Sequence, residues 1–452
     1  MASTAASLLY PAEQMSELPI TPPPPERVED TGLTEEFISE LVLRTMYVQG
    51  AQLGRALSDS IRLPFILIDD MLLTMQQRRL VEVRGVTGPG RATYLFDLTE
   101  AGRDRAREAM MVTTYVGPAP VPLSQYRVSV GAQSISHARV NQAEVHGGLS
   151  WLVLDASTVD MVGPAINSAK SLFLYGESGN GKTAIAETIA GMLGGSQFIP
   201  YAVEVNGEIL SLYDPVYHRA VELGDGDGRK KSWLGNAAAY DQRYVIVQRP
   251  VVLTGGELSL NQLDLQYDQS AKLYQAPFQM KANGGVLIVD DFGRQRVPPR
   301  DLLNRWIVPL EKKVDYLTLH TGGKFPVPFD CLLIFATNIP PTSLVEEAFL
   351  RRIHYKIRVE SPTREQYERI FQTYCDQNGI PYEPAAVEQI YREFYERYSI
   401  APRGCHPRDL IDHLSDIATY METEPRLTPE LVRLAGNSYF LDFPTAPPTP
   451  TQ

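Results

Sequence analysis

The chain has 452 residues, a length that suggests about three domains. Hydrophobic residues make up 44% and charged residues 21%, which is the composition of a soluble globular protein. Its 42 Lys and Arg against 54 Asp and Glu give a net charge of -12, so bulk charge does not attract nucleic acid or anionic lipid. The three cysteines are too few for a disulfide scaffold or a four-ligand zinc site. No apolar run is long enough to span a membrane, and the first residues lack the features of a signal peptide, so a cytoplasmic location is expected.

Both ends of the chain are predicted to be disordered tails. Residues 1–29 contain a run of four prolines beginning at Pro22, and residues 442–452 combine prolines with threonines. A third proline-rich stretch, residues 113–127, carries prolines at alternate positions and predicts an extended, semi-rigid linker.

The region between the first tail and the linker, residues 30–112, is predicted to contain three helices, a two-stranded hairpin and a closing helix. The first helix follows the cap residue Thr34, the third spans residues 64–77, and Leu98-Thr-Glu-Ala-Gly-Arg103 opens the last one. This order resembles a winged helix-turn-helix domain, and the stretch from Leu98 resembles the one that follows the wing in several bacterial transcription regulators. The resemblance implies that the third helix would be the one to enter the major groove of DNA.

The charges of this region favour a protein-binding or ring-building role over DNA reading. The third helix holds Asp69 and Asp70 and no Lys or Arg, and residues 31–112 hold 10 basic against 11 acidic residues. DNA reading is the second interpretation, because the wing is basic, with Arg78, Arg79, Arg84 and Arg91 against Glu82.

After the linker, alternating strand and helix signals over residues 128–360 predict a parallel sheet covered by helices, and helical periodicity predicts an all-helical lid over residues 361–441. The strongest signal is an apolar strand ending at Tyr175, a glycine-rich loop and an amphipathic helix after Thr183. Together they match G-x-x-x-x-G-K-[ST], the phosphate-binding P-loop, in its required context. The expected nucleotide-binding residues are Gly176, Glu177, Ser178, Gly179, Asn180, Gly181, Lys182 and Thr183.

Each part of this motif has a physical role. The glycines allow a tight turn whose backbone N–H groups converge on phosphate oxygens, and the helix N-terminus adds its dipole. Lys182 is expected to reach the β- and γ-phosphates, and the Thr183 hydroxyl is expected to bind Mg²⁺.

Two carboxylates follow a second buried-type strand, Gly284-Gly-Val-Leu-Ile-Val289. The end of the strand next to the phosphate loop is where Mg²⁺ and the attacking water must be held. Asp290 is therefore the predicted metal-side residue and Asp291 the predicted general base. Without the phosphate loop, these carboxylates would be interpreted as a solvated acidic turn.

Three later segments carry a resemblance to the AAA+ ATPases. Leu332-Leu-Ile-Phe-Ala-Thr-Asn338 resembles the sensor 1 strand, which implies that Asn338 positions the lytic water. Arg351 and Arg352 lie in a segment that resembles the one supplying an arginine finger to a neighbouring subunit; the sequence does not tell them apart. Arg408 opens a helix as the sensor 2 arginine of the lid does. The resemblance covers roughly residues 145 to 440.

A β-hairpin predicted over residues 314–327, with a turn at Gly322-Gly323, is similar to the insert that marks the pre-sensor-1 branch of AAA+. Residues 278–285 are similar to the equivalent stretch of enhancer-binding and MoxR-like ATPases, but the sigma-factor loop of enhancer-binding proteins is absent. Most AAA+ ATPases have Asp-Glu in place of Asp290-Asp291, and the shorter Asp291 predicts slow intrinsic turnover.

A long insertion separates the phosphate loop from the carboxylate strand. It holds a hairpin signal of the Asn206-Gly207 type, and its aromatic residues Tyr213, Tyr217 and Trp233 are candidates for a pore loop that grips substrate. The Asp-Gly repeat at 224–227 lacks the later glutamate of a calcium loop and is interpreted as a surface turn.

The sequence therefore predicts an α/β protein: a P-loop AAA+ core with a parallel sheet, a C-terminal helical lid and an N-terminal winged-helix (α+β) domain. The resemblance implies an ATPase that uses ATP and Mg²⁺, assembles as a homo-oligomeric ring, and remodels a partner protein bound through the winged helix. The alternative is a DNA-binding regulator that uses ATP as a slow switch. A degenerate nucleotide-binding scaffold is disfavoured, because every expected catalytic position holds a suitable polar group.

Overall fold

A computed structural model describes residues 21–221, 240–344 and 347–440. The chain divides into two compact units, each discontinuous in sequence. The first comprises Met1–Ala138, Leu193–Leu287 and Asp301–Leu332; the second comprises Arg139–Met192, Ile288–Arg300 and Leu333–Gln452.

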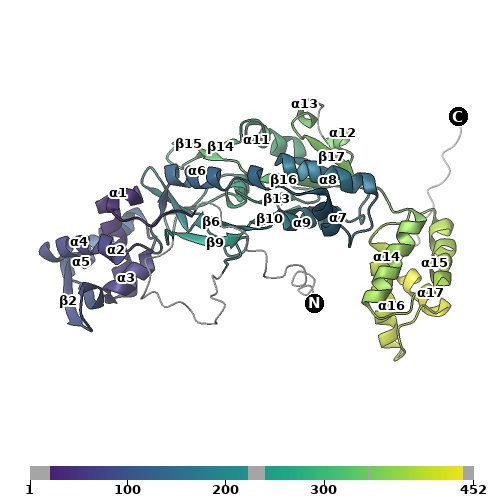
Figure 1. The fold of residues 1–452 in the computed structure, drawn as a ribbon, viewed down its shortest axis with the longest axis horizontal. Coiled ribbons are helices and arrows are strands. Elements are labelled where there is room, and N and C mark those ends of the chain that lie inside the picture. Colours follow the sequence, from purple (N-terminus) through teal and green to yellow (C-terminus); the bar gives the residue numbers. More distant parts are fainter. Residues whose placement is uncertain (1–20, 222–239, 345–346, 441–452) are drawn as a thin grey trace. The chain divides into compact units, whose positions relative to one another are not determined.

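The N-terminal part of the first unit, coloured purple in Figure 1, packs helices against a small antiparallel sheet with strand order β1-β3-β2. Its hydrophobic core includes Ile38, Leu72 and Phe96, all fully buried. The Thr34 hydroxyl accepts a hydrogen bond from Phe37 N (3.2 Å) and caps α2, the helix that was predicted to follow it; the short α1 before it was not predicted. The elements are α1 (Val28–Thr31), α2 (Glu35–Gln49), β1 (Gln52–Leu53), α3 (Gly54–Ile61), α4 (Phe65–Gln77), β2 (Val81–Val86), β3 (Tyr94–Leu98) and α5 (Glu100–Val112).

Two proline-rich stretches, predicted as a tail and a linker, make defined contacts in their described residues. In the described part of the first tail, Pro25 is buried and the carbonyl of Pro22 accepts a hydrogen bond from Asp241 N (2.9 Å). In the predicted linker, Ala119 N donates to Ile61 O (2.7 Å), and β4 (Val121–Pro122) pairs in parallel with β7. Proline makes the chain extended, and the proline carbonyls and the N–H groups of intervening residues remain available for hydrogen bonds, so both stretches pack against other parts of the first unit.

The remainder of the first unit contains a five-stranded sheet with order β11-β12-β8-β7-β4 and two strand pairs, β6 with β9 and β14 with β15. Both predicted hairpins are present: Asn206 and Gly207, with φ of 52° and 85°, join β7 to β8, and β14 pairs with β15 in an antiparallel register. The elements are α6 (Leu123–Ala132), β6 (Ser196–Pro200), β7 (Ala202–Val205), β8 (Glu208–Ser211), β9 (Tyr244–Gln248), β11 (Gln266–Asp268), β12 (Leu273–Gln275), α10 (Phe278–Lys281), α11 (Pro299–Lys312), β14 (Val314–Thr318) and β15 (Lys324–Pro328).

The central sheet is a five-stranded parallel sheet with order β10-β13-β16-β5-β17, which confirms the predicted α/β class. Every residue of β13 and β16 is buried, as expected for strands covered on both faces. The strands are β5 (Leu172–Tyr175), β10 (Val251–Thr254), β13 (Val286–Val289), β16 (Leu332–Thr337) and β17 (Tyr355–Arg358); the helices of this region are α7 (Gln142–Gly148), α8 (Ala156–Ser168), α9 (Lys182–Met192), α12 (Pro341–Leu344) and α13 (Glu347–Leu350).

The described residues of the C-terminal region form helices joined by loops, with no strand among them. Four helices, drawn as green to yellow ribbons in Figure 1, enclose a core that includes Tyr367, Phe371 and Ile411. They are α14 (Arg364–Gln377), α15 (Pro384–Ile390), which continues as a π-helical turn (Tyr391–Glu396), α16 (His406–Tyr420) and α17 (Pro429–Tyr439).

Candidate functional site

The predicted phosphate loop joins the buried strand β5 to α9 within the second unit. Three of its glycines have positive φ: Gly176 at 145°, Gly179 at 84° and Gly181 at 81°. A Cβ on Gly176 would lie 2.2 Å from the carbonyl oxygen of Val359, so only glycine fits there. The loop therefore has the backbone shape that turns N–H groups toward a bound anion.

Lys182, the first residue of α9, folds back into this loop. Its Nζ donates to the carbonyl oxygens of Gly176 (3.0 Å) and Glu177 (2.8 Å), and its side chain is buried. Burial lowers the pKa of Lys182, although the nearby carboxylates of Asp290 and Asp291 oppose the shift. A buried ammonium whose direct partners are carbonyl dipoles is stabilised by a nearby anion, and the phosphates of a nucleotide would supply one.

Thr183 and Asp290 meet although they are 107 residues apart in sequence: the threonine hydroxyl donates to Oδ2 of Asp290 (2.8 Å). The other carboxylate oxygen, Oδ1, accepts from Asp291 N (2.9 Å), and Gln295 Nε2 donates to the Asp290 carbonyl (3.0 Å). A hydroxyl and a carboxylate are the oxygen ligands that Mg²⁺ prefers, so the pair fits a nucleotide-bound magnesium ion.

The order of the strands differs from the expectation that the carboxylate strand lies next to the phosphate-loop strand. β16 lies between β13 and β5, so the predicted sensor strand occupies the neighbouring position. In parallel strands the carboxyl ends lie at one edge of the sheet, and Asp290 still reaches Thr183 from two strands away.

Asn338 follows the end of this intervening strand. Thr337 pairs in register with Tyr175, which places Asn338 beside the start of the phosphate loop. Among the described residues, the Oδ1 atom of Asn338 is a buried acceptor without a hydrogen-bond donor. An unsatisfied buried acceptor is costly, so this amide is suited to orient a water or a ligand.

Asp291 is exposed and has a left-handed backbone, with φ of 47°. This conformation is uncommon outside glycine, and such positions often occur at functional sites. It turns the chain away from β13, and Phe292 N then donates to the carbonyl of Ala336 (2.8 Å) in β16. The structure thus brings Lys182, Thr183, Asp290, Asp291 and Asn338 to one edge of the sheet.

The lid meets the phosphate loop through a segment that the sequence analysis did not select, residues 403–405. Gly404 N donates to Oδ1 of Asn180 (3.2 Å), and Cys405 N donates to Gly179 O (2.8 Å). The Arg403 guanidinium lies 3.9 Å from the Glu177 carboxylate, and its positive charge helps to lower the pKa of Lys182. The sequence signal for this segment is the Ala-Pro-Arg-Gly stretch before α16, which places an arginine just ahead of a helix.

The three arginines predicted for the site, Arg351, Arg352 and Arg408, lie outside the phosphate loop. Arg408 lies in the first turn of α16 and is directed to its neighbour Asp409, whose Oδ1 accepts from Nε (2.9 Å) and Nη2 (2.8 Å). Arg351, which is exposed, and Arg352, which is half-buried, lie between α13 and the edge strand β17. The carbonyl of Arg352 accepts from the Ser171 hydroxyl (3.2 Å), which ties this turn to the start of the phosphate-loop strand.

Two of the predicted pore-loop aromatics are packed within the first unit. The Tyr213 ring stacks on His218 with centroids 5.8 Å apart, and the Tyr217 ring lies edge-on to Phe278 at 5.6 Å. Trp233 and the Asp-Gly repeat at 224–227 lie outside the described residues.

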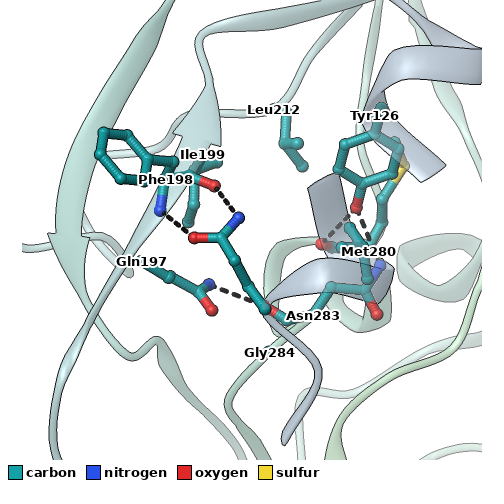
Figure 2. A pocket seen from close by; sticks show the side chains of 10 residues that line it. Tyr126, Gln197, Phe198, Ile199, Leu212, Met280, Asn283 and Gly284 are labelled. Atoms are coloured by element: carbon teal, nitrogen blue, oxygen red, sulfur yellow. Dashed lines mark hydrogen bonds between the residues drawn. The ribbon is translucent and has the colours of Figure 1, made fainter. Parts of the chain in front are cut away.

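A cavity of about 20 Å³ lies in the first unit, where Tyr126, Gln197 and Asn283 are among the residues that line it (Figure 2). Its polar lining is already paired: Gln197 Nε2 donates to the Asn283 carbonyl (2.8 Å), and Asn283 Nδ2 donates to Tyr126 Oη (2.8 Å). This volume holds about one water molecule, so the cavity is too small to bind a substrate.

Two further features of the described residues concern membranes and metals. None of their helices combines the length and the apolarity that crossing a bilayer requires. Within the same residues, no three His, Cys, Asp or Glu side chains form a metal cluster. The Thr183–Asp290 pair would bind magnesium together with nucleotide phosphates rather than alone.

Comparison with known proteins gives three findings. The family described as "Domain of unknown function (DUF8689)" matches residues 363–438, the helical region. No curated protein matches the sequence. A mutant of RuvB from Thermotoga maritima is 15% identical, with a TM-score of 0.34 over 67% of this chain and 71% of that one. NtrX from Brucella abortus in complex with ADP is 14% identical, with a TM-score of 0.39 over 77% and 68%. Likenesses this distant do not bear on the activity of this chain.

Proposed function

We propose that this protein is an AAA+ ATPase of the pre-sensor-1-insert branch that binds and hydrolyses MgATP. The observation that carries the proposal is the contact of Thr183 with Asp290 beside a buried Lys182. These three residues present a cation for phosphates and two oxygen ligands for Mg²⁺ at the carboxyl edge of a parallel sheet. The glycine backbone of the loop adds N–H donors for the same phosphates.

In this proposal the residues divide the reaction between them. The loop residues from Gly176 to Gly181 hold the phosphates with Lys182, and Thr183 and Asp290 hold Mg²⁺, which would neutralise charge on the phosphate oxygens. Asp291 accepts the proton of the attacking water, which Asn338 orients. The lid contributes an arginine, Arg403 or Arg408, on the phosphate side.

The site is proposed to be completed by a neighbouring subunit. Arg351 or Arg352, beside the edge strand, would reach the γ-phosphate of the next subunit's nucleotide. An arginine finger is worth roughly 10³ to 10⁵ in rate, so hydrolysis would depend on assembly of a ring. Such an assembly would use hydrolysis to remodel a partner protein bound through the N-terminal region.

The experiment that tests this proposal is ATP turnover measured as a function of protein concentration. The specific activity is expected to rise steeply with concentration, because dilution separates each site from its neighbour's arginine. Lys182→Ala serves as the blank. Asp291→Asn is expected to lower kcat by about 10²-fold or more while ATP binding is retained, since the carboxylate acts only in the chemical step.

Two outcomes would contradict parts of the proposal. A flat specific activity with full turnover would exclude a shared site. Tight ATP binding without turnover at any concentration would point to a nucleotide switch, and duplex-DNA binding would then be measured.

A further inference from the structure

Helix α4 of the N-terminal region, which was predicted as its third helix, presents an exposed face that is apolar and acidic. Ile66 is 73% exposed and Leu73 is 37% exposed, and Asp70 lies between them. The spacings of four and three residues put these side chains on one side of the helix. We call this surface the α4 outer face; its members are Ile66, Asp70, Leu73, Thr74 and Gln77, all exposed.

The opposite side of α4 holds the helix in place. Ile68 and Leu72 are fully buried and Met71 and Met75 are nearly so, all within the core of the first unit's N-terminal part. Phe65 at the start of α4 lies against Gly54 at the start of α3: a Cβ on Gly54 would lie 2.5 Å from the Phe65 ring, so the two helices are in close contact. The outer face is therefore presented on a rigid element, which lowers the entropy cost of docking.

The arginines that would bring DNA to this surface are engaged inside the domain. Arg91 Nε pairs with Oδ1 of Asp69 (2.6 Å), and its guanidinium lies over the Tyr94 and Phe96 rings at 5.8 and 5.7 Å. Arg84 pairs with the buried Asp97 (2.9 Å) and with Glu82 (3.2 Å). Two of the four wing arginines are thus neutralised by carboxylates of the same domain.

The charge left on the outer face is negative. Within the described residues, Asp70 has no salt bridge, and the exposed Arg78 and Arg79 lie two turns further on, beyond the end of the helix. Phosphates facing Asp70 would be repelled, whereas a cationic side chain would be attracted. Ile66 and Leu73, on either side of it, would gain free energy by burial against aliphatic side chains.

We propose that the α4 outer face is the docking site for a basic amphipathic helix of a partner protein. A Lys or Arg of that helix would lie opposite Asp70, and its aliphatic residues would cover Ile66 and Leu73, as the apolar stripe of an amphipathic helix packs on another helix. This rests on the proposed function only in that the ATPase acts on another protein.

The test measures binding of a fluorescent helical peptide of about 20 residues, with Leu at i, i+3, i+4 and i+7 and flanking Lys, to the full chain without nucleotide. A second peptide carries Glu at every Lys position. Asp70→Lys is expected to weaken binding of the Lys peptide by about tenfold, because an attraction becomes a repulsion, and to strengthen binding of the Glu peptide. Ile66→Ser is expected to weaken both. Asp104→Lys, an equal charge change at an exposed site of α5, is the matched control and should change neither.

These variants alter exposed side chains, and an unchanged thermal midpoint will confirm that each is folded. Equal effects of Asp70→Lys and Asp104→Lys would overturn the proposal, because binding would then reflect net charge alone. A second result would also overturn the proposal: neither peptide binds, but a DNA duplex of about 30 base pairs does. If the double variant Arg78→Glu and Arg79→Glu then loses duplex binding, the ligand of this region is DNA. Because no nucleotide is present, these results are separate from any failure of ATP turnover.

Discussion

At the scale of single residues, two arginines compete for one role in the lid. Arg408 has the position expected from the motif, but its guanidinium is paired with Asp409. Arg403 belongs to the segment whose backbone is hydrogen-bonded to Gly179 and Asn180, and its side chain faces Glu177 of the same loop. The backbone next to Arg403 is hydrogen-bonded to the phosphate loop, so the Arg403 guanidinium is held close to where phosphates would bind. The Arg408 guanidinium instead pairs with its sequence neighbour Asp409.

We therefore expect Arg403→Ala to weaken ATP binding by about 10- to 100-fold, the loss of one charge-assisted contact of roughly 1.5 to 3 kcal/mol. Arg408→Ala, the matched control on the same helix entry, should leave the affinity within about twofold. Titration of each variant with a fluorescent ATP analogue measures both values. The opposite ranking would return the role to Arg408.

At the scale of elements, the packing of α17 against the π-helical turn depends on one glycine. A Cβ on Gly436 would lie 2.1 Å from the ring of Phe394, and Phe394 in turn stacks on Phe440 with centroids 5.2 Å apart. No turn or positive φ marks this glycine in the sequence; only close approach of the two elements requires it.

Gly436→Ala is expected to destabilise the lid by about 1 to 3 kcal/mol, because the methyl group cannot be accommodated without moving a ring or a helix. The matched control is Gly147→Ala in α7, where the new Cβ meets nothing within 4 Å. That change should be neutral or stabilising by up to about 1 kcal/mol, since alanine loses less backbone entropy. Thermal unfolding of the two variants gives the comparison; equal midpoints would mean that the helices separate to make room.

At the scale of the whole molecule, a buried arginine joins the N-terminal region to the rest of the first unit. Arg243 is 1% exposed, and Nη2 lies 2.7 Å from Asp241. Its other donors reach the carbonyls of Thr31 (2.8 Å) and Pro120 (3.4 Å) and the side chain of Gln125 (3.2 Å). The predicted semi-rigid linker is thereby held at Pro120 and Gln125, because one guanidinium supplies five donors in fixed directions.

Arg243→Met is expected to destabilise the first unit by about 3 to 5 kcal/mol, because Asp241 is left as an unpaired buried charge. Hydrogen exchange should quicken across residues 28–122, where the lost partners lie. Arg433→Met is the control: this exposed arginine pairs with Glu393, and its loss should leave the thermal midpoint nearly unchanged, because a solvent-screened surface pair contributes little. Unchanged exchange in the Arg243 variant would show that strand β4 alone holds the connection.

The local elements were predictable because their signals are local. The P-loop strand and helix, the Asn206-Gly207 hairpin and the cap at Thr34 each depend on residues a few positions apart, and the structure has them where predicted. The proline-rich stretch 113–127 shows the limit of such local signals. Alternate prolines specify an extended backbone, and whether that backbone is solvated or joins a sheet depends on distant residues.

The sequence by itself determined the phosphate-loop motif, the polar residues offered at the strand ends and the α/β class, since these follow from side-chain chemistry and short-range periodicity. Only the tertiary structure decided that β16 lies between β13 and β5, that Thr183 meets Asp290, and that Arg403 rather than Arg408 faces the loop. Those contacts join residues far apart in the chain, and no local preference encodes them. They are selected by burial of the sheet and by the need of every buried polar group for a partner.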